Sequence, residues 1–314
     1  MLFRSFRGSI QMVDTKNVNR IDQGVATRAS GVALSWDGQV LYLASVTSVT
    51  AYDVFSGKVK AEINLGFKHI RPFCPVRGGV LILTRENTAE LWDYSLSKRI
   101  KWWTNLPGVE QLISISEEKV AFVRKVDVKV LDSRSGKFVS TIPVLQGRVV
   151  TWNSKCQLLI VHTYDVSNFL QLLDDTTVVW RKEDLFILPD YGGAAFSPKE
   201  QFLVVPTIET WLVLDAETGN TLRTLPTSPS FSFACTFISD DSCVISSTST
   251  SSVELFDVKS GELLTAIDVE SHVTCLAACP FNSVLAIGLE YSTPNFKVVR
   301  VHLPRGGDRG NETR

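Results

Sequence analysis

Hydrophobic and polar residues alternate in short runs along almost the whole chain, and the clearest run spans residues 252–268 (SVELFDVKSGELLTAID). Val253, Leu255 and Asp257 share one face of this run up to a turn, and the alternation resumes after Gly261. A period of two residues is typical of a half-buried β-strand. The run therefore predicts a β-hairpin in which Asp257 accepts hydrogen bonds from turn N–H groups and Gly261 takes a positive φ.

The same hairpin pattern returns at a regular spacing. Clear copies lie at residues 51–63, 91–103, 130–142 and 212–225, with weaker copies at 12–21 and 172–181. The aspartates that mark the turns are Asp14, Asp53, Asp93, Asp132, Asp174, Asp215 and Asp257. Successive markers are 39, 40, 39, 42, 41 and 42 residues apart. A period of about 40–45 residues with four short strands per repeat is typical of a β-propeller, so we expect an all-β, seven-bladed β-propeller of four-stranded antiparallel blades.

The seventh repeat supplies only three strands, the last of them at residues 296–303. An open ring would leave unpaired strand edges at both ends. We therefore expect residues 17–22 to form the outer strand of the seventh blade, so that N- and C-terminal strands close one blade. Residues 9–14 would then be one strand in excess, and whether they displace or extend part of the last blade stays open.

Composition adds the domain organisation and the environment. No linker divides the chain, so residues 1–303 are expected to form a single domain, and the charged, Gly-rich residues 304–314 a disordered tail. The net charge of -1 makes nucleic acid an unlikely partner. Residues 1–13 do not resemble a signal peptide and no run of about 18 apolar residues occurs. These features predict no membrane insertion and an intracellular, cytoplasmic protein, with the nucleus also open.

Residue types that carry chemistry are scattered along the sequence. The cysteines are Cys74, Cys156, Cys235, Cys243, Cys275 and Cys279, and none of them forms a C-x-x-C pair. Only Cys275 and Cys279 are expected on one face of a strand, and a zinc site would need two more ligands. The four histidines lie in separate repeats, and no phosphate loop, G-x-S-x-G elbow or H-E-x-x-H motif is present. We expect buried reduced thiols, no metal, no cofactor and no catalytic residues.

The motifs LWDY (91–94), SWDG (35–38) and AFSP (195–198), with the D-x-x-[ST]-G turns, carry a resemblance to a known family. Over residues 9–303 the chain resembles the WD-repeat family. The resemblance implies a seven-bladed propeller that acts as a rigid platform for protein complexes, a class that rarely catalyses reactions. The chain departs from the family pattern, because the Gly-His pair and the aspartate between the second and third strands are missing, and only Trp92 occupies the tryptophan position. Hydrophobic packing is therefore expected to hold the blades together.

A second resemblance, to quinoprotein propellers, rests on D-x-x-[ST]-G turns such as the one in residues 212–222 (LVLDAETGNTL). It implies a pyrroloquinoline cofactor with metal-binding carboxylates, and an oxidoreductase activity. The chain shows neither an export signal nor a carboxylate cluster, and most copies lack the tryptophan that should follow the glycine. Binding of a small-molecule cofactor is the alternative to the platform.

Two sets of aromatic residues are candidates for binding another protein. Tyr164 with Phe169, and Tyr291 with Phe296, stand at matching positions in the elongated loops of the fourth and seventh repeats. Aromatic side chains on loops can anchor a partner, although they can equally pack beneath their own loops.

The second set is Trp102 with Trp103, on an expected outer strand. Neighbouring strand residues point to opposite faces, so one of the two is expected to be partly exposed and the other to pack. Lys98, Arg99 and Lys101 could form a basic rim around the exposed one, or protect the edge of the blade.

Together these features predict a non-catalytic protein–protein interaction platform, a scaffold, adaptor or sensor. It would be a monomeric propeller within a larger intracellular complex, and its partners would be other proteins.

Overall fold

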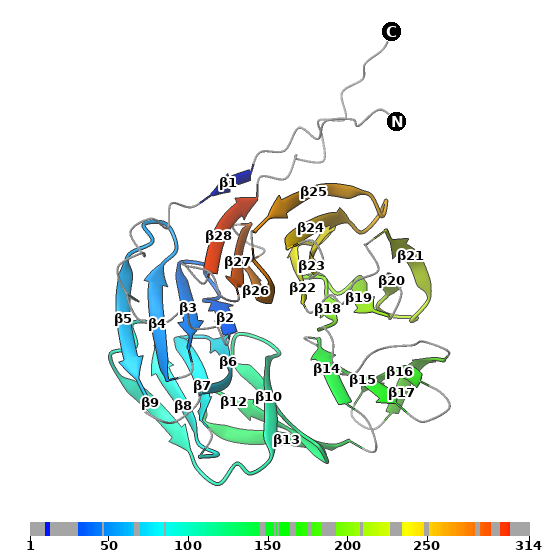
Figure 1. Ribbon diagram of the computed structural model, residues 1–314. Coiled ribbons are helices and arrows are strands. Elements are labelled where there is room, and N and C mark those ends of the chain that lie inside the picture. Colours follow the sequence, from blue (N-terminus) through cyan, green and yellow to red (C-terminus); the bar gives the residue numbers. More distant parts are fainter. Residues whose placement is uncertain are drawn as a thin grey trace.

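Seven four-stranded antiparallel sheets stand around a central axis in the computed structural model of the chain (Figure 1). The structure describes residues 10–12, 31–45, 47–65, 70–84, 86–144, 148–153, 155, 157–163, 168–174, 177–183, 193–207, 210–226, 234–247, 251–269, 271–279, 283–289 and 296–301. Within these ranges the chain forms strands and turns, and no helix that could cross a membrane. The all-β class and the seven-bladed propeller are confirmed.

Each sheet is one blade, and in the first six blades the strands follow the sequence order from the axis to the rim. The first three blades are β2 (Gly31–Leu34), β3 (Val40–Ala44), β4 (Ser48–Asp53) and β5 (Val59–Asn64); β6 (Ile70–Val76), β7 (Gly79–Thr84), β8 (Ala89–Asp93) and β9 (Arg99–Trp103); and β10 (Val109–Ser114), β11 (Lys119–Arg124), β12 (Asp127–Asp132) and β13 (Lys137–Pro143). The next three are β14 (Arg148–Trp152), β15 (Gln157–Thr163), β16 (Asn168–Asp174) and β17 (Thr177–Lys182); β18 (Ala195–Phe196), β19 (Phe202–Pro206), β20 (Trp211–Asp215) and β21 (Thr221–Leu225); and β22 (Cys235–Ser239), β23 (Ser242–Ser247), β24 (Ser252–Asp257) and β25 (Leu263–Asp268).

The seventh blade closes the ring with strands from both ends of the chain. Its order is β26 (Val273–Cys279), β27 (Val284–Leu289), β28 (Phe296–Val301) and then β1 (Ile10–Met12), which is antiparallel to β28 (Figure 1).

Closure by an N-terminal strand is therefore confirmed, but the expected segment was wrong. One place remained open in this sheet, and β1 fills it, although the repeat spacing had assigned this segment to a surplus hairpin arm. Residues 17–22, the expected outer strand, lie outside the described ranges.

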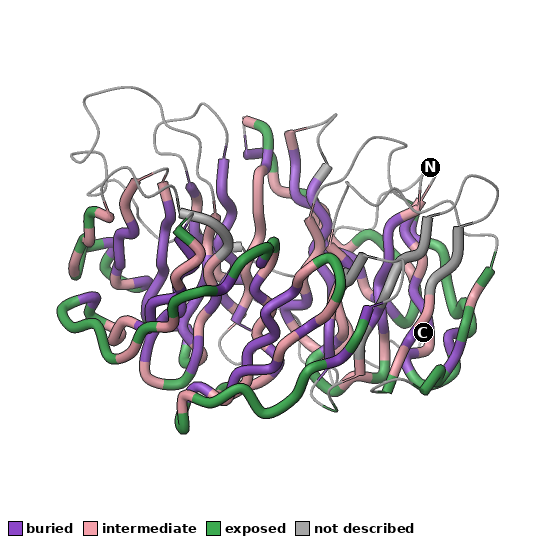
Figure 2. The backbone as a smooth tube through the Cα atoms, turned by 90° about the horizontal axis from the view of Figure 1, so that it is seen from below, coloured by how far each residue is buried: buried purple, intermediate pink, exposed green. Residues whose placement is uncertain are grey.

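Hydrophobic clusters join the blades, as the departures from the repeat pattern led us to expect. Seven clusters occur among the described residues, and each lies between two neighbouring blades around the ring. The second strand of a blade can contribute side chains to the clusters on both of its faces. In β3, Tyr42 packs toward the second blade and Leu41 toward the seventh. Buried residues consequently concentrate inside the ring, whereas exposed ones follow the outer strands and turns (Figure 2).

The turns between third and outer strands have the chemistry expected from their sequence. Asp257 Oδ1 accepts hydrogen bonds from the N–H groups of Lys259 (2.9 Å) and Ser260 (2.7 Å). Gly261 has a φ of 76°, a conformation that glycine adopts with little strain. Beyond each such turn the outer strand carries a β-bulge in all of the first six blades. Bulges interrupt the exposed edge of a sheet and so protect it from pairing with other strands.

An additional hydrogen bond, which we call the clasp, links three outer strands to the turn of the next blade. The donors and acceptors are Lys101 Nζ with Arg134 O (2.8 Å), Trp180 Nε1 with Ala216 O (3.1 Å), and Arg223 Nε with Lys259 O. All three donors occupy the same position, opposite the second residue before the turn aspartate of their own blade. The sequence pattern did not predict this contact.

The turn glycine makes room for the clasp. A Cβ added to Gly136, Gly219 or Gly261 would lie 3.1 Å from Lys101 Nζ, 2.7 Å from Trp180 Cδ2 or 3.4 Å from Arg223 Cδ, respectively. Where the next blade has no such glycine, the donor position holds a short side chain, as at Ala61, Ser140 and Thr265. The long donor and the turn glycine therefore occur together, in neighbouring blades.

We predict that Gly219→Ala destabilises the protein more than Gly108→Ala does. Both glycines have a positive φ, 71° and 73°, but a Cβ would meet the Trp180 ring only at Gly219 and nothing within 4 Å at Gly108. The extra cost should be about 1–3 kcal/mol in the free energy of unfolding, measured by urea denaturation. The difference should disappear when both variants are made in a Trp180→Ala background, and equal costs in the wild-type background would contradict the clasp.

We also predict a loss of stability in acid that involves Asp53. The hydrogen bond from the backbone N–H of Ser56 and the nearby ammonium group of Lys60 lower the pKa of Asp53 from 3.8 to about 2. Because the pKa is lower in the folded protein, the stabilisation is present above the unfolded pKa and is lost as the pH falls through the folded value. The free energy of unfolding should therefore drop between about pH 4 and pH 2, and Asp53→Asn should reduce this slope. An unchanged slope in the variant would rule out a contribution from Asp53.

Candidate functional site

Of the loop aromatics predicted from the fourth and seventh repeats, only Phe296 has a described side chain. Tyr164 and Tyr291 lie outside the described residues, as does the side chain of Phe169. Phe296 is only 2% exposed and packs on Tyr52 across the closing contact of the ring, with ring centroids 5.1 Å apart. Phe296 therefore belongs to the core and is not accessible to a partner. For this residue the alternative expectation, that the aromatic side chain packs within the protein, is the correct one.

The two neighbouring tryptophans of β9 point in opposite directions, as expected from their position in a strand. Trp103 faces the third blade, where its Nε1 donates to Gly136 O (3.0 Å) and its ring packs on the hydrophobic cluster of that contact. Trp102 faces the other way and is 59% exposed. It is more exposed than Phe55 (51%) or Phe138 (37%).

Trp102 is positioned by an ion pair on the same face of the blade. Glu90 lies directly opposite Trp102 in the β8–β9 ladder, and its side chain is 5% exposed. One carboxylate oxygen accepts a hydrogen bond from Trp92 Nε1 (3.0 Å), and the other accepts one from Arg99 NH1 (3.0 Å). The guanidinium carbon of Arg99 lies 4.9 Å from the ring centroid of Trp102, which is the geometry of a cation–π contact.

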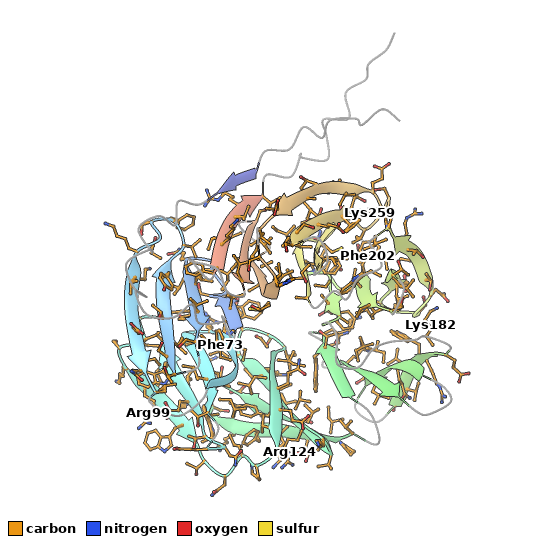
Figure 3. All side chains as sticks on the ribbon, viewed as in Figure 1. Phe73, Arg99, Arg124, Lys182, Phe202 and Lys259 are labelled. Carbon is orange, nitrogen blue, oxygen red and sulfur yellow. The ribbon has the colours of Figure 1, made fainter. Side chains whose placement is uncertain are left out.

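We call Glu90, Arg99, Ile100 and Trp102 the Trp102 surface. Ile100 is the bulged residue of β9 and is 42% exposed, so two large hydrophobic side chains stand exposed within three positions. Arg99 lies at the outside of the ring, well away from the axis (Figure 3). The surface therefore sits on the rim of the second blade, on a strand that is anchored to β8 and, through Trp103, to the third blade.

The expected basic rim is modified by these contacts. Lys101 is engaged in the clasp to the third blade, and Arg99 is paired with Glu90. Lys98 is exposed at the end of the turn. The sequence could have indicated the Glu90–Arg99 pair, because Glu90 is the only charged residue between Glu86 and Asp93 in an otherwise hydrophobic strand.

A polar hollow of about 360 Å³ lies between the second and third blades on the side of the turns. Arg77, Glu118, Ser133 and Arg134 line it. Arg77 NH1 is 3.5 Å from Glu118 Oε1, so charges of opposite sign compensate one another at its wall. This mixture does not favour a particular ligand charge.

The cysteines and acidic residues do not assemble a metal centre within the described ranges. No group of three or more His, Cys, Asp or Glu residues there is close enough to hold an ion. Cys74, Cys243 and Cys279 are buried, whereas Cys235 and Cys275 are half-buried, and Cys156 lies outside the described residues. Burial raises the pKa of the thiols of Cys74 and Cys243, which keeps them protonated at neutral pH.

Comparison of the sequence with models of protein families and with curated proteins finds no match. The candidate site is therefore argued from its geometry.

We predict that the two tryptophans of β9 differ in their contribution to stability. Trp102→Ala removes an exposed ring and its contact with Arg99, so it should change the free energy of unfolding by less than about 1 kcal/mol. Trp103→Ala removes a packed ring and the hydrogen bond to Gly136 O, and should cost about 3 kcal/mol. Urea denaturation of the two variants measures both values, and a large cost for Trp102→Ala would mean that its role is structural.

Proposed function

We propose that this protein is a non-catalytic platform that binds other proteins, and that the Trp102 surface is one of its contact sites. The observation that carries the proposal is the exposure of Trp102 on a rim strand whose neighbours are fixed. Tryptophan is among the residues that contribute most to binding when a partner covers it.

The arrangement of the surface supports this role. Glu90 and Arg99 hold the Trp102 ring in place, so little conformational entropy is lost when a partner binds. Trp102, which lies opposite Glu90 in the β8–β9 ladder, is exposed to solvent. Burial within the blade therefore does not account for a tryptophan at this position. The resemblance of LWDY and the D-x-x-[ST]-G turns to WD repeats supports the same class of function, in an intracellular complex.

The proposal is tested by affinity capture with the full chain as bait, followed by mass spectrometry. Trp102→Ala should remove or strongly reduce a subset of the proteins captured by the wild type. Leu263→Ala is the matched control, because Leu263 is 49% exposed on the outer strand of the sixth blade. This control should capture the wild-type set.

An identical set for wild type and Trp102→Ala would contradict the role of the Trp102 surface. Reproducible thermal stabilisation by pyrroloquinoline quinone with Ca²⁺ would contradict the platform itself and favour the cofactor-binding alternative.

A further inference from the structure

We infer that the Trp102 surface binds an acidic, extended segment of a partner protein. One carboxylate of the segment binds Arg99, and an apolar side chain two residues away covers Trp102. The inference rests on the proposed function and adds the chemistry of the partner.

The charge around the surface favours an anionic partner. Among residues 98–103, Lys98 and Arg99 are exposed cations and no residue is acidic, whereas the Lys101 ammonium is engaged in the clasp. The acidic group opposite Trp102, Glu90, is almost inaccessible, and both of its oxygens already accept hydrogen bonds. The charge that faces solvent along β9 is therefore positive, which favours the approach of carboxylates.

Arg99 is prepared to bind a carboxylate. Its NH1 group donates to Glu90, its guanidinium carbon lies over the Trp102 ring, and its side chain is still 44% exposed. A guanidinium group has five N–H donors, and only the bond to Glu90 involves Arg99 among the described residues. The remaining donors form a fixed fork that matches the two oxygens of a carboxylate.

The spacing of the two contacts fits an extended chain. The guanidinium carbon of Arg99 is 4.9 Å from the centroid of the Trp102 ring. Side chains at positions i and i+2 of an extended chain share one face and lie about 7 Å apart. A segment with Asp or Glu two positions from a large apolar residue can therefore reach both groups.

The backbone of β9 is also available. β9 is the last strand of its sheet, and no described strand pairs with its outer edge. Beyond the bulge at Ile100, residues Lys101–Trp103 pair regularly with β8, so their outward N–H and C=O groups can bond to an added segment.

The sixth blade offers an internal comparison. Its outer strand exposes Leu263, but Glu262 precedes the strand and Asp268 is its last residue. An acidic segment should be repelled there. Exposed hydrophobic surface alone therefore does not define the site.

The inference is tested by selecting binders of the purified full chain from a display library of random twelve-residue peptides. The wild-type protein should enrich peptides in which Asp or Glu stands two positions from Leu, Ile, Val or an aromatic residue. A fluorescein-labelled synthetic peptide of the enriched sequence then gives dissociation constants by fluorescence anisotropy.

Trp102→Ala should weaken this peptide at least about tenfold. Arg99→Lys keeps the charge next to Glu90 but loses the fork, and should also weaken binding about tenfold. Leu263→Ala should bind within about twofold of the wild type. Replacing the acidic residue of the peptide by Asn or Gln should have the same effect as Arg99→Lys, and the loss should not add to it in the Arg99→Lys variant.

The outcomes separate the two proposals. Trp102-dependent peptides without acidic residues would overturn the inference and leave the platform standing. Acidic peptides that bind Arg99→Lys as well as the wild type would also overturn it. If no peptide depends on Trp102, both the inference and the proposed contact site fall.

Discussion

The structure depends on the burial of hydrophobic strands between neighbouring sheets. Outside the fourth blade, where most side chains of β15 are not described, the second strand of each blade has apolar side chains on both faces. Only the adjacent blades can cover them, as Leu41 and Tyr42 of β3 illustrate. A fully buried aliphatic or aromatic side chain contributes roughly 1.5–3 kcal/mol, so an uncovered face would be costly. A row of blades would leave two such faces in water, whereas a closed ring leaves none. The closing contact between the first and seventh blades, in which Tyr52 packs on Phe296, is therefore as necessary as the other six.

This rigid frame determines where recognition can take place. Because the inner strands and the faces of the blades are used mostly for packing, the exposed large hydrophobic side chains that are described lie on the outer strands and in the turns. Trp103 and Trp102 show the division within one strand: the first joins two blades, and the second is left for another molecule. The same hydrogen-bonded network that stabilises the rim also orders the exposed ring, so stability and recognition are linked at β9.

Much of the fold could be predicted from the sequence, because the strands and turns depend on the pattern of residues close together in the chain. The alternation of residues gave the strands, and the Asp257 and Gly261 positions gave the turns, with their positive φ. Contacts between blades are not local, so the clasp from Trp180 to Ala216 was not predicted. The outer strand of the seventh blade was misplaced for a different reason. A three-residue strand such as Ile10–Met12 has too few positions for a recognisable alternation of hydrophobic and polar residues. At the site, the opposite directions of Trp102 and Trp103 were expected, but which of them faces solvent depends on the third blade.

The pairing of β1 with β28 has a consequence for biosynthesis. The ribosome makes β1 before the other strands of the ring and β28 after them, so Ile10–Met12 has no partner strand until β28 has been made. During this time the nascent chain is a growing stack of sheets with an unsatisfied face at its leading end. A chaperone that shields such surfaces would therefore be useful throughout the synthesis of the ring, until β28 can pair with β1.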